Sequence, residues 1–476
     1  MSKKFSLTTN SSVNKLYVDN AILQVTTNMI ESTTAMKSFI NTQISDFFNS
    51  KLYYEVNNFK LSNSVLDVNG NTTLSLSKNT GNYILNNNTK MNNSSPTPLA
   101  LGTGLNGSCL CMVKDSTVNI YMGGNFTTAN GIPANNIVKY NTLTGVWSSL
   151  GTGLNAECSC LAINADGIIY VGGQFSSAGG NTANKIAKYD PTTNLWSPII
   201  SNTQNGIQTS RVNSLGFDYE GSLYVGTNGN IKISNNIDTH GIIKYVPRNN
   251  EWYDIGGVAG IFSTVIHVNF SINKKTLYIA GVFNIAGKGT NVAANSTCLA
   301  KYDIIENKWI AMDKGMSWCN YLAVGIDDTV YISSDWGVIY SYNPITDKNT
   351  AIHGFNAWSN CLIVDDNGNL ILGGNFTLPG KYIGKYDVKS KTAMAFNTGL
   401  NNSCHCLLID NKRIYAGGSF TTVDNISANR VVCYDTQYIN LSIDGLTNKI
   451  KMFSNDCIEI IKSENDDIYV TNILKL

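Results

Sequence analysis

The stretch Ile120-Tyr-Met-Gly-Gly-Asn-Phe-Thr-Thr decides the fold, because close copies of it return along the chain. Three clear copies are Ile169-Tyr-Val-Gly-Gly-Gln-Phe-Ser-Ser, Leu370-Ile-Leu-Gly-Gly-Asn-Phe-Thr and Ile414-Tyr-Ala-Gly-Gly-Ser-Phe-Thr-Thr. Weaker copies begin at Leu223, Leu277 and Val330. Self-similarity at a regular spacing is the signature of a repeat architecture.

A second marker, a tyrosine after a short apolar run, follows each copy. These tyrosines lie 40 to 57 residues apart, and in the first four copies a tryptophan follows seven residues later. We predict that the marker residues shape each repeat and bind no ligand. They are Gly123, Gly124, Tyr140, Trp147, Gly172, Gly173, Tyr189, Trp196, Tyr245, Trp252, Tyr302, Trp309, Tyr342, Gly373, Gly374, Tyr386, Gly417, Gly418 and Tyr434.

One copy can be divided into strands directly. Cys160-Leu-Ala-Ile-Asn is apolar, Ala165-Asp-Gly is a turn, and Ile168 to Gly173 is a second strand. After a polar loop, Lys185-Ile-Ala-Lys-Tyr alternates and Leu195-Trp-Ser-Pro-Ile closes the unit. Four short antiparallel strands without a helical period predict an all-β fold in which the sheets stack around an axis as propeller blades.

Four apolar residues, Gly-Gly and then Tyr-x6-Trp resemble the kelch repeat of the kelch and galactose-oxidase superfamily. The resemblance implies a seven-bladed kelch-type β-propeller over residues 96–438. The fifth copy departs from it with Ser333-Ser334, and copies five to seven lack the tryptophan. Thr97-Pro-Leu-Ala-Leu-Gly-Thr-Gly matches the end of a complete copy, so we expect residues 98–101 to complete the last blade around Tyr434.

The flanking segments differ from the repeats. Ile22, Met29, Met36, Ile40 and Phe47 lie on a 4-3-4-3 seam, which predicts a helical, coiled-coil-like stalk within residues 1–55. One amphipathic helix packed on the propeller is the alternative. Residues 56–95 are expected to hold a short hairpin around Asn69-Gly70 and a linker. Residues 439–476 alternate in polarity and predict a β tail.

Short motifs in these flanks resemble viral fibres. Lys15-Leu-Tyr-Val-Asp-Asn-Ala-Ile is similar to the lead-in of phage and viral tail-fibre stalks, and Leu66-Asp-Val-Asn-Gly-Asn-Thr-Thr is similar to the β segments that follow them. The resemblance implies a homo-oligomer, a trimer, through residues 15–55. Frequent Asn, Lys, Ile and Tyr with scarce Arg and Pro is typical of an AT-rich genome, as in a large DNA virus (giant virus).

Composition limits the partners. The 476 residues carry 34 basic and 33 acidic side chains, so no strong field attracts nucleic acid or an anionic membrane. No apolar run approaches the ~20 residues of a membrane helix, and the N-terminus lacks the apolar core of a secretory signal. We therefore expect no membrane insertion and location in a virion assembled in the host cytoplasm, with a cytoplasmic protein as the alternative.

Cysteines and histidines are the candidate metal ligands. Residues two apart in a strand point the same way at a separation of about 7 Å, which is too far for a disulfide. We therefore expect no disulfides within the Cys-x-Cys pairs and expect these thiols to be reduced. The inner-strand thiols could hold a soft metal ion. We favour the alternative, in which cysteine serves as a small apolar side chain where the sheets converge tightly. The cysteines concerned are Cys109, Cys111, Cys158, Cys160, Cys361, Cys404 and Cys406.

Galactose oxidase, in the same superfamily, holds copper with two His and two Tyr. The four histidines here, His240, His267, His353 and His405, fall at unrelated points of the repeat, which favours isolated surface or loop residues. Asp365-Asp-Asn-Gly-Asn resembles half a calcium loop but lacks the distal Glu, so a plain turn is expected. We expect no catalytic residue, no cofactor and no metal.

The expected function is therefore binding by a non-enzymatic virion surface or fibre (fiber) component. Its propeller would contact capsid or host-surface protein or glycan, in host attachment or capsid assembly. The alternative is an intracellular kelch-type scaffold for protein–protein interaction. A propeller oxidase or lyase is the distant third.

Overall fold

The computed structural model describes two parts of the chain. The first runs from 97 to 435, with gaps at 202–203, 234–236, 260–262, 289–293, 296, 313–315, 317, 335–336, 397, 411–412 and 425. The second consists of strands between 53 and 84 and between 438 and 475. By contacts the chain divides into two compact units, residues 95–437 and residues 1–94 with 438–476. The predicted stalk helix lies outside the described residues.

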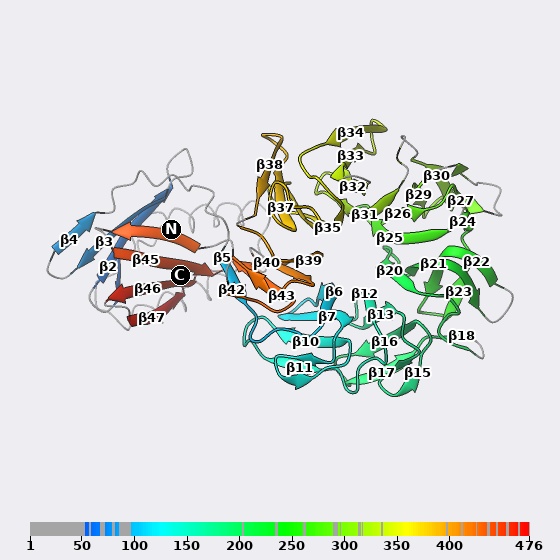
Figure 1. Ribbon diagram of the computed structural model, residues 1–476, viewed down its shortest axis with the longest axis horizontal. Coiled ribbons are helices and arrows are strands. Elements are labelled where there is room, and N and C mark those ends of the chain that lie inside the picture. Colours follow the sequence, from blue (N-terminus) through cyan, green and yellow to red (C-terminus); the bar gives the residue numbers. More distant parts are fainter. Residues whose placement is uncertain are drawn as a thin grey trace, which may run out of the picture. The chain divides into compact units, whose positions relative to one another are not determined.

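Residues 97–435 form successive four-stranded antiparallel sheets, numbered here 1 to 7 in chain order (Figure 1). Sheet 1 contains β6 (Ser108–Lys114), β7 (Asn119–Asn125), β10 (Ile137–Asn141) and β11 (Trp147–Ser149). Sheet 2 contains β12 (Cys158–Ile163), β13 (Ile169–Gly173), β16 (Ile186–Asp190) and β17 (Leu195–Pro198). The strands predicted for this copy are confirmed.

Sheets 3 and 4 are joined by a pairing of Asn228 with Thr264. Sheet 3 contains β20 (Val212–Phe217), β21 (Leu223–Ile233), β22 (Ile237–Val246) and β23 (Glu251–Tyr253). Sheet 4 contains β25 (Thr264–Phe270), β26 (Thr276–Val282), β29 (Leu299–Asp303) and β30 (Lys308–Ala311). Sheet 5 contains β31 (Cys319–Val324), β32 (Val330–Ser334), β33 (Ile339–Asn343) and β34 (Lys348–Ile352).

Sheet 6 contains β35 (Ser359–Val364), β36 (Leu370–Gly374), β37 (Ile383–Asp387) and β38 (Thr392–Ala395). Sheet 7 contains β39 (Cys404–Asp410), β40 (Arg413–Gly418), β43 (Val431–Asp435) and, from the other end of this unit, β5 (Thr97–Ala100). Tyr434 pairs with Pro98 and Val432 with Ala100. The prediction that residues 98–101 complete the sheet around Tyr434 is confirmed.

The first strands of the sheets surround a common centre. Each contacts the first strand of the next sheet, in the order β6, β12, β20, β25, β31, β35 and β39, and β39 contacts β6 again. Figure 1 shows the sheets succeeding one another around this centre, from cyan through green and yellow to orange. Apolar clusters fill the spaces between neighbouring sheets, so each sheet buries both faces.

Short β-strands pair with one another in the loops between the main strands. They are β8 (Thr128–Ala129) with β9 (Ile132–Pro133), β14 (Ser177–Ala178) with β15 (Asn181–Thr182), β18 (Ile200–Ser201) with β19 (Gln204–Asn205), β24 (Gly257–Ala259) with β27 (Ile285–Lys288) and β28 (Ala294–Asn295), and β41 (Thr422–Val423) with β42 (Ile426–Ser427). The sequence patterns did not predict them.

Backbone hydrogen bonds explain the second glycine and the phenylalanine of the repeat. The Gly173 amide donates to the Lys185 carbonyl at 3.0 Å, and the Lys185 amide donates to the Phe175 carbonyl at 2.8 Å. Lys185 has φ +66°, in the left-handed region, while the Phe175 ring is fully buried. The same bonds recur in four other sheets, through the left-handed residues Asn136, Cys298, Tyr382 and Arg430.

The second glycine also permits close approach of two strands. A Cβ on Gly173 would stand 2.1 Å from the carbonyl oxygen of Glu157, the residue just before β12. The first glycine makes room for the neighbouring sheet instead, since a Cβ on Gly123 would stand 2.3 Å from Cys158 Sγ. Close approach of backbone and of neighbouring side chains therefore accounts for the paired glycines.

Sheet 5 keeps its four strands although it lacks the glycines. The Ser334 hydroxyl donates to the Trp318 carbonyl at 2.9 Å, and the Ser333 hydroxyl donates to the Ser359 carbonyl of sheet 6 at 2.8 Å. The two hydroxyls thus bond to carbonyls beside the positions that hold glycine in the regular copies.

The Tyr and Trp markers are cross-strand neighbours within sheets 1 to 4. Tyr189 pairs with Trp196, and their ring centroids lie 5.1 Å apart. The Trp196 indole donates to the Leu150 carbonyl at 2.7 Å, which ties sheet 2 to the end of sheet 1. The corresponding pairs of sheets 1, 3 and 4 have centroids 4.9 to 5.0 Å apart.

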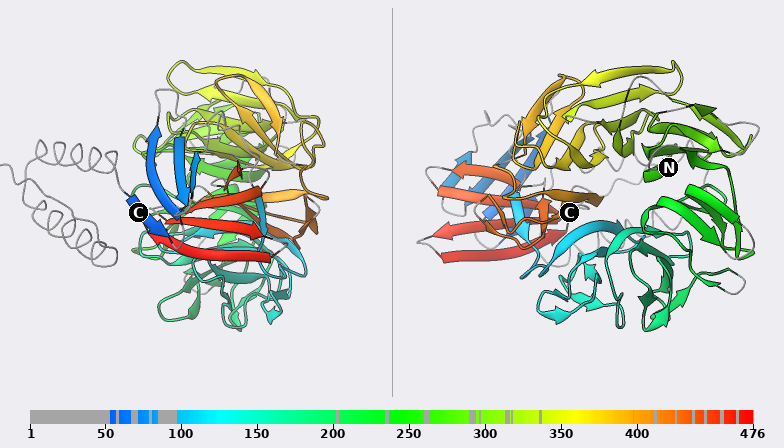
Figure 2. Two further views of the ribbon diagram at one scale, coloured as in Figure 1. Left: turned by 90° about the vertical axis from the view of Figure 1, so that its left-hand side faces the viewer. Right: turned by 45° about the vertical axis from the view of Figure 1, so that its right-hand side comes forward.

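Two further sheets form the other unit (Figure 2). One contains β1 (Tyr53–Val56), β2 (Phe59–Leu66), β3 (Thr72–Lys78) and β4 (Gly81–Ile84). The other contains β44 (Tyr438–Ile443), β45 (Leu446–Phe453), β46 (Cys457–Glu464) and β47 (Asp467–Lys475). β2 and β3 pair antiparallel, as the hairpin prediction requires, and the β tail is present as strands. Among the described residues, no helix has the length and hydropathy to cross a membrane.

Candidate functional site

A register shift near the start of each first strand determines how the inner side chains point. In β6 it lies between Cys109 and Cys111, and the other first strands carry it at the corresponding place. Cys109 therefore meets Cys406 of sheet 7, whereas Cys111 meets Cys158 of sheet 2. The prediction that the two cysteines of a Cys-x-Cys pair point the same way was wrong, because a β-bulge changes the alternation.

The inner thiols form pairs across sheet junctions. Sγ separations are 3.8 Å for Cys109–Cys406, 3.8 Å for Cys111–Cys158 and 4.0 Å for Cys361–Cys404. Burial raises the pKa of Cys158, Cys361 and Cys406 well above the usual value, with a further contribution from the neighbouring thiols. In the described part of the chain, no three His, Cys, Asp or Glu side chains are grouped closely enough to hold a metal ion.

His267 and Tyr321 occupy the thiol positions of sheets 4 and 5. Their rings stack with centroids 3.8 Å apart, and the Leu322 amide donates to His267 Nδ1 at 3.3 Å. Both rings keep some accessible surface, yet protein surrounds them, and burial lowers the pKa of His267 to about 3. Burial also raises the pKa of Tyr321, with smaller contributions from inner thiols. The expectation of an isolated surface or loop residue was wrong for His267.

We call the end of the sheets at which the first strands begin the entry face. The residues just before the bulged pair lie there, one from each sheet: Ser108, Glu157, Arg211, Thr264, Trp318, Trp358 and Ser403. Trp318 is 39% exposed and Trp358 is 50% exposed. Because β31 and β35 are in contact, two tryptophans at the same register lie on adjacent sheets.

The backbone beneath both tryptophans is fixed. The Trp358 carbonyl accepts the Asn375 amide at 2.9 Å, and the Trp318 carbonyl accepts the Ser334 hydroxyl. The Trp318 indole donates to Asn320 Oδ1 at 2.7 Å, which orients that ring. The entry face thus presents two large aromatic surfaces on a rigid base beside amide groups.

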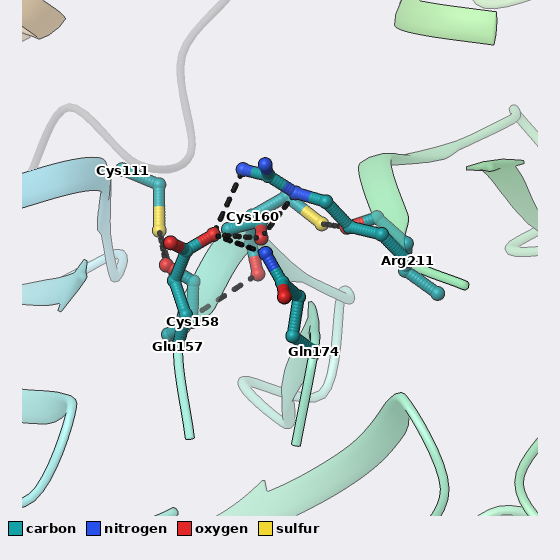
Figure 3. A network of polar contacts seen from close by, with 8 residues as sticks. Cys111, Glu157, Cys158, Cys160, Gln174 and Arg211 are labelled. Atoms are coloured by element: carbon teal, nitrogen blue, oxygen red, sulfur yellow. Dashed lines mark hydrogen bonds and ion pairs between the residues drawn. The ribbon is translucent and has the colours of Figure 1, made fainter. Parts of the chain in front are cut away.

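The charges of the entry face are neutralised between sheets 2 and 3. Arg211 Nη2 lies 2.9 Å from Glu157 Oε1, and Arg211 Nε donates to the Ser159 hydroxyl at 2.9 Å (Figure 3). The Ser159 hydroxyl and the Gln174 amide also donate to Glu157 Oε1, at 3.0 and 3.4 Å. This network links two sheets and leaves neither charge without a partner.

His405 is the second histidine near this face. Its Nε2 lies 2.9 Å from the Ser419 hydroxyl, which lies 2.9 Å from the Ser108 hydroxyl of sheet 1. Burial lowers the pKa of His405, and nearby Glu157 partly offsets the effect. The group is thus a polar bridge between sheets 7 and 1.

The opposite end, which we call the hairpin face, carries the turns between the first and second and between the third and fourth strands. Several turns expose apolar residues, including Leu143, Ile305, Ile326 and Ile345. An open groove of about 660 Å³ lies there between sheets 2 and 3. Its charged lining residues are of both signs: Asp166, Lys188, Asp190, Glu220 and Arg248.

The predicted markers and the candidate binding residues are different sets. The structure brings the marker residues together inside and between sheets, and none of the tryptophan markers is exposed. Sequence reasoning missed Trp318 and Trp358. Their positions immediately before the first strands of copies five and six, where the other copies carry Ser, Glu, Arg or Thr, were the available signal.

Comparison with known proteins supports the propeller assignment. Residues 83–216 match the model of the Rax2 C-terminal beta propeller domain, and residues 410–437 match a beta-propeller domain of unknown function, DUF5122. A search of curated proteins found no match.

Several solved structures match the chain at low sequence identity. The extracellular domain described as one-component system BT4673 from B. thetaiotaomicron is 14% identical, with a TM-score of 0.49 over 80% of this chain and 48% of that one. The extracellular domain of the hybrid two-component system BT3049 from B. thetaiotaomicron is 12% identical, with a TM-score of 0.48 over 78% and 48%. A chain of the mitotic checkpoint complex is 13% identical, with a TM-score of 0.35 over 56% and 77%.

This chain therefore spans about half the length of the first two structures. The repeat, the closed series of inner strands and the two family matches together identify residues 95–437 as a β-propeller domain.

Proposed function

We propose that the chain is a non-enzymatic binding protein, a surface or fibre component of a virus particle. Its seven-bladed, kelch-type propeller contacts a protein or glycan partner through the entry face. The observation that carries the proposal is the pair of exposed tryptophans, Trp318 and Trp358, at one register on adjacent sheets.

Aromatic rings held on a rigid base are suited to recognition. The electron-rich face of an indole attracts the weakly positive C–H groups of a sugar ring, and exposed tryptophans also dominate protein interfaces. Asn320 and Asn360, two residues after Trp318 and Trp358, fill the half-buried bulge positions, where Asn320 accepts the Trp318 indole N–H and Asn360 donates to the Cys404 carbonyl of sheet 7. Glu157 and Arg211 are the two charged residues among the seven assigned above to the entry face, and they pair with each other, which favours an uncharged partner surface such as a neutral glycan.

Replacing Trp358 with alanine is expected to weaken binding to the partner surface at least tenfold, about 1.4 kcal/mol, because the most exposed ring is removed. Binding of the full chain to a panel of immobilised glycans and to host-cell surfaces measures it, with Trp318→Ala as the second variant. Tyr253, 41% exposed on the outer strand of sheet 3, supplies the matched control, Tyr253→Ala. Equal losses in the control and tryptophan variants would refute the entry face as the contact.

The fibre assignment depends on residues 15–55, whose heptad pattern supports a trimer. We expect the mass of the full chain in solution to be that of a trimer and to fall to a monomer when residues 1–55 are removed. A full-length monomer would instead favour an intracellular kelch-type scaffold, the candidate that the kelch-like Tyr–Trp pairs also support. A stoichiometric copper in the purified protein would overturn both in favour of an oxidase.

A further inference from the structure

We propose that Cys298 and Cys319 form a disulfide bond between sheets 4 and 5 when the chain folds under oxidising conditions. Their Sγ atoms lie 2.7 Å apart, and both residues are fully buried. The three other thiol pairs across sheet junctions lie 3.8 to 4.0 Å apart. The Cys298–Cys319 pair is therefore distinguished within this chain by a much closer approach.

The backbone fixes Cys298 in place. It is the left-handed residue of sheet 4, with φ +62°, a conformation that favours Asn or Gly. Its amide donates to the Phe283 carbonyl at 3.0 Å, and its carbonyl accepts the Gly281 amide at 2.9 Å. At the corresponding place in sheet 1, the Asn136 side chain reaches sheet 2 and donates to the Leu154 carbonyl. The same position in sheet 4 directs a thiol at the next sheet.

The junction between sheets 4 and 5 differs from the other junctions in the residues that pack between the two sheets. Sheet 4 has Ala280 at the position of the first glycine, which in other sheets faces the following sheet, and the first-strand cysteine of sheet 5 faces Cys298. Met316 Sδ lies 4.0 Å from Cys319 Sγ, so the surroundings of the pair are apolar and sulfur-rich. A covalent link here would join the most divergent sheet to its neighbour.

The reaction is a thiol–disulfide exchange with a low-molecular-weight disulfide such as oxidised glutathione. One cysteine loses its proton and attacks the glutathione disulfide, which forms a mixed disulfide and releases one glutathione thiol. The second cysteine then attacks the protein-bound sulfur and releases the second glutathione thiol. The two cysteines lose two hydrogen atoms in total, and glutathione disulfide is reduced by the same two electrons.

The test uses the purified full chain in a glutathione redox buffer, with urea below the unfolding range so that local opening admits the oxidant. Remaining thiols are then alkylated in denaturant, and the chain is digested with trypsin without reductant. Cleavage after Lys301 and Lys314 separates the two cysteines unless they are cross-linked. The expected product is one linked peptide pair, lighter by two hydrogen atoms than the separate peptides combined, and a higher unfolding temperature than the reduced chain has.

Two variants control the assignment. Cys298→Ser is expected to abolish the linked peptide, whereas Cys361→Ser, at a pair 4.0 Å apart, leaves it unchanged. Complete alkylation of both Cys298 and Cys319 in the oxidised wild-type chain would overturn the proposal. Equal cross-linking of the other thiol pairs would overturn it as well, because the close approach would then have no consequence.

Discussion

Replacing Gly173 with alanine is expected to lower the free energy of unfolding by about 2–4 kcal/mol. The new Cβ would stand 2.1 Å from the Glu157 carbonyl oxygen, which accepts the Gln174 amide at 3.0 Å, so the two backbone segments cannot move independently. The shift would also disturb the bond from the Gly173 amide to Lys185. Urea unfolding of the full chain, followed by tryptophan fluorescence, measures the loss.

Gly180→Ala is the matched control for Gly173→Ala. Gly180 belongs to the same repeat, has φ +84° and has open space where its Cβ would be. Its replacement adds only the cost of a left-handed alanine, about 1 kcal/mol. If the two variants lose the same stability, close approach of β12 and β13 is not the reason for the second glycine.

Acidification from pH 7 to pH 5 is expected to destabilise the chain through His267 by up to about 2 kcal/mol. The pKa of His267 is lowered to about 3 in the folded chain, against 6.5 when it is unfolded. At pH values between these two pKa values, His267 binds a proton in the unfolded chain and stays neutral in the folded chain. The free energy of unfolding therefore falls as the pH falls from about 6.5 toward about 3. Burial also lowers the pKa of His405, so this residue contributes a loss of the same sign.

His267→Gln removes the titrating group while keeping a polar side chain near the Leu322 amide. We expect this variant to lose less stability than the wild type between pH 7 and pH 5, whatever its stability at pH 7. His353→Gln is the control, because His353 is exposed. Unfolding free energies at several pH values decide the matter. Parallel curves for wild type and His267→Gln would show that the folded chain does admit the proton there.

The repeat made most of the β-propeller predictable. Gly172, Gly173 and Phe175 lie within one short motif, and their roles depend on contacts that every regular copy reproduces. The sequence match between residues 97–104 and the end of a complete copy also located the closing strand, since a shared pattern implies a shared place in the sheet.

Features that differ among the copies were not predictable in the same way. The β-bulge in each first strand leaves no residue signature, and without it Cys109 and Cys111 were expected to point together. The equivalence of His267 to the inner cysteines of other sheets can be recognised only when the register of the first strands is known. Trp318 and Trp358 became candidates for binding only when their exposure could be compared with that of buried Trp147 and Trp196.

The strand β5 has a consequence for synthesis of the chain on the ribosome. Its partner β43 is the last strand of the propeller to be made, so Thr97 must wait for Asp435 before the two can pair. Until then β5 has no partner strand, and sheet 7 lacks the strand that connects it along the chain to sheet 1. Nascent chains stalled before Val431 should therefore be sensitive to protease at residues 97–101, and protection should appear only after Asp435 has emerged.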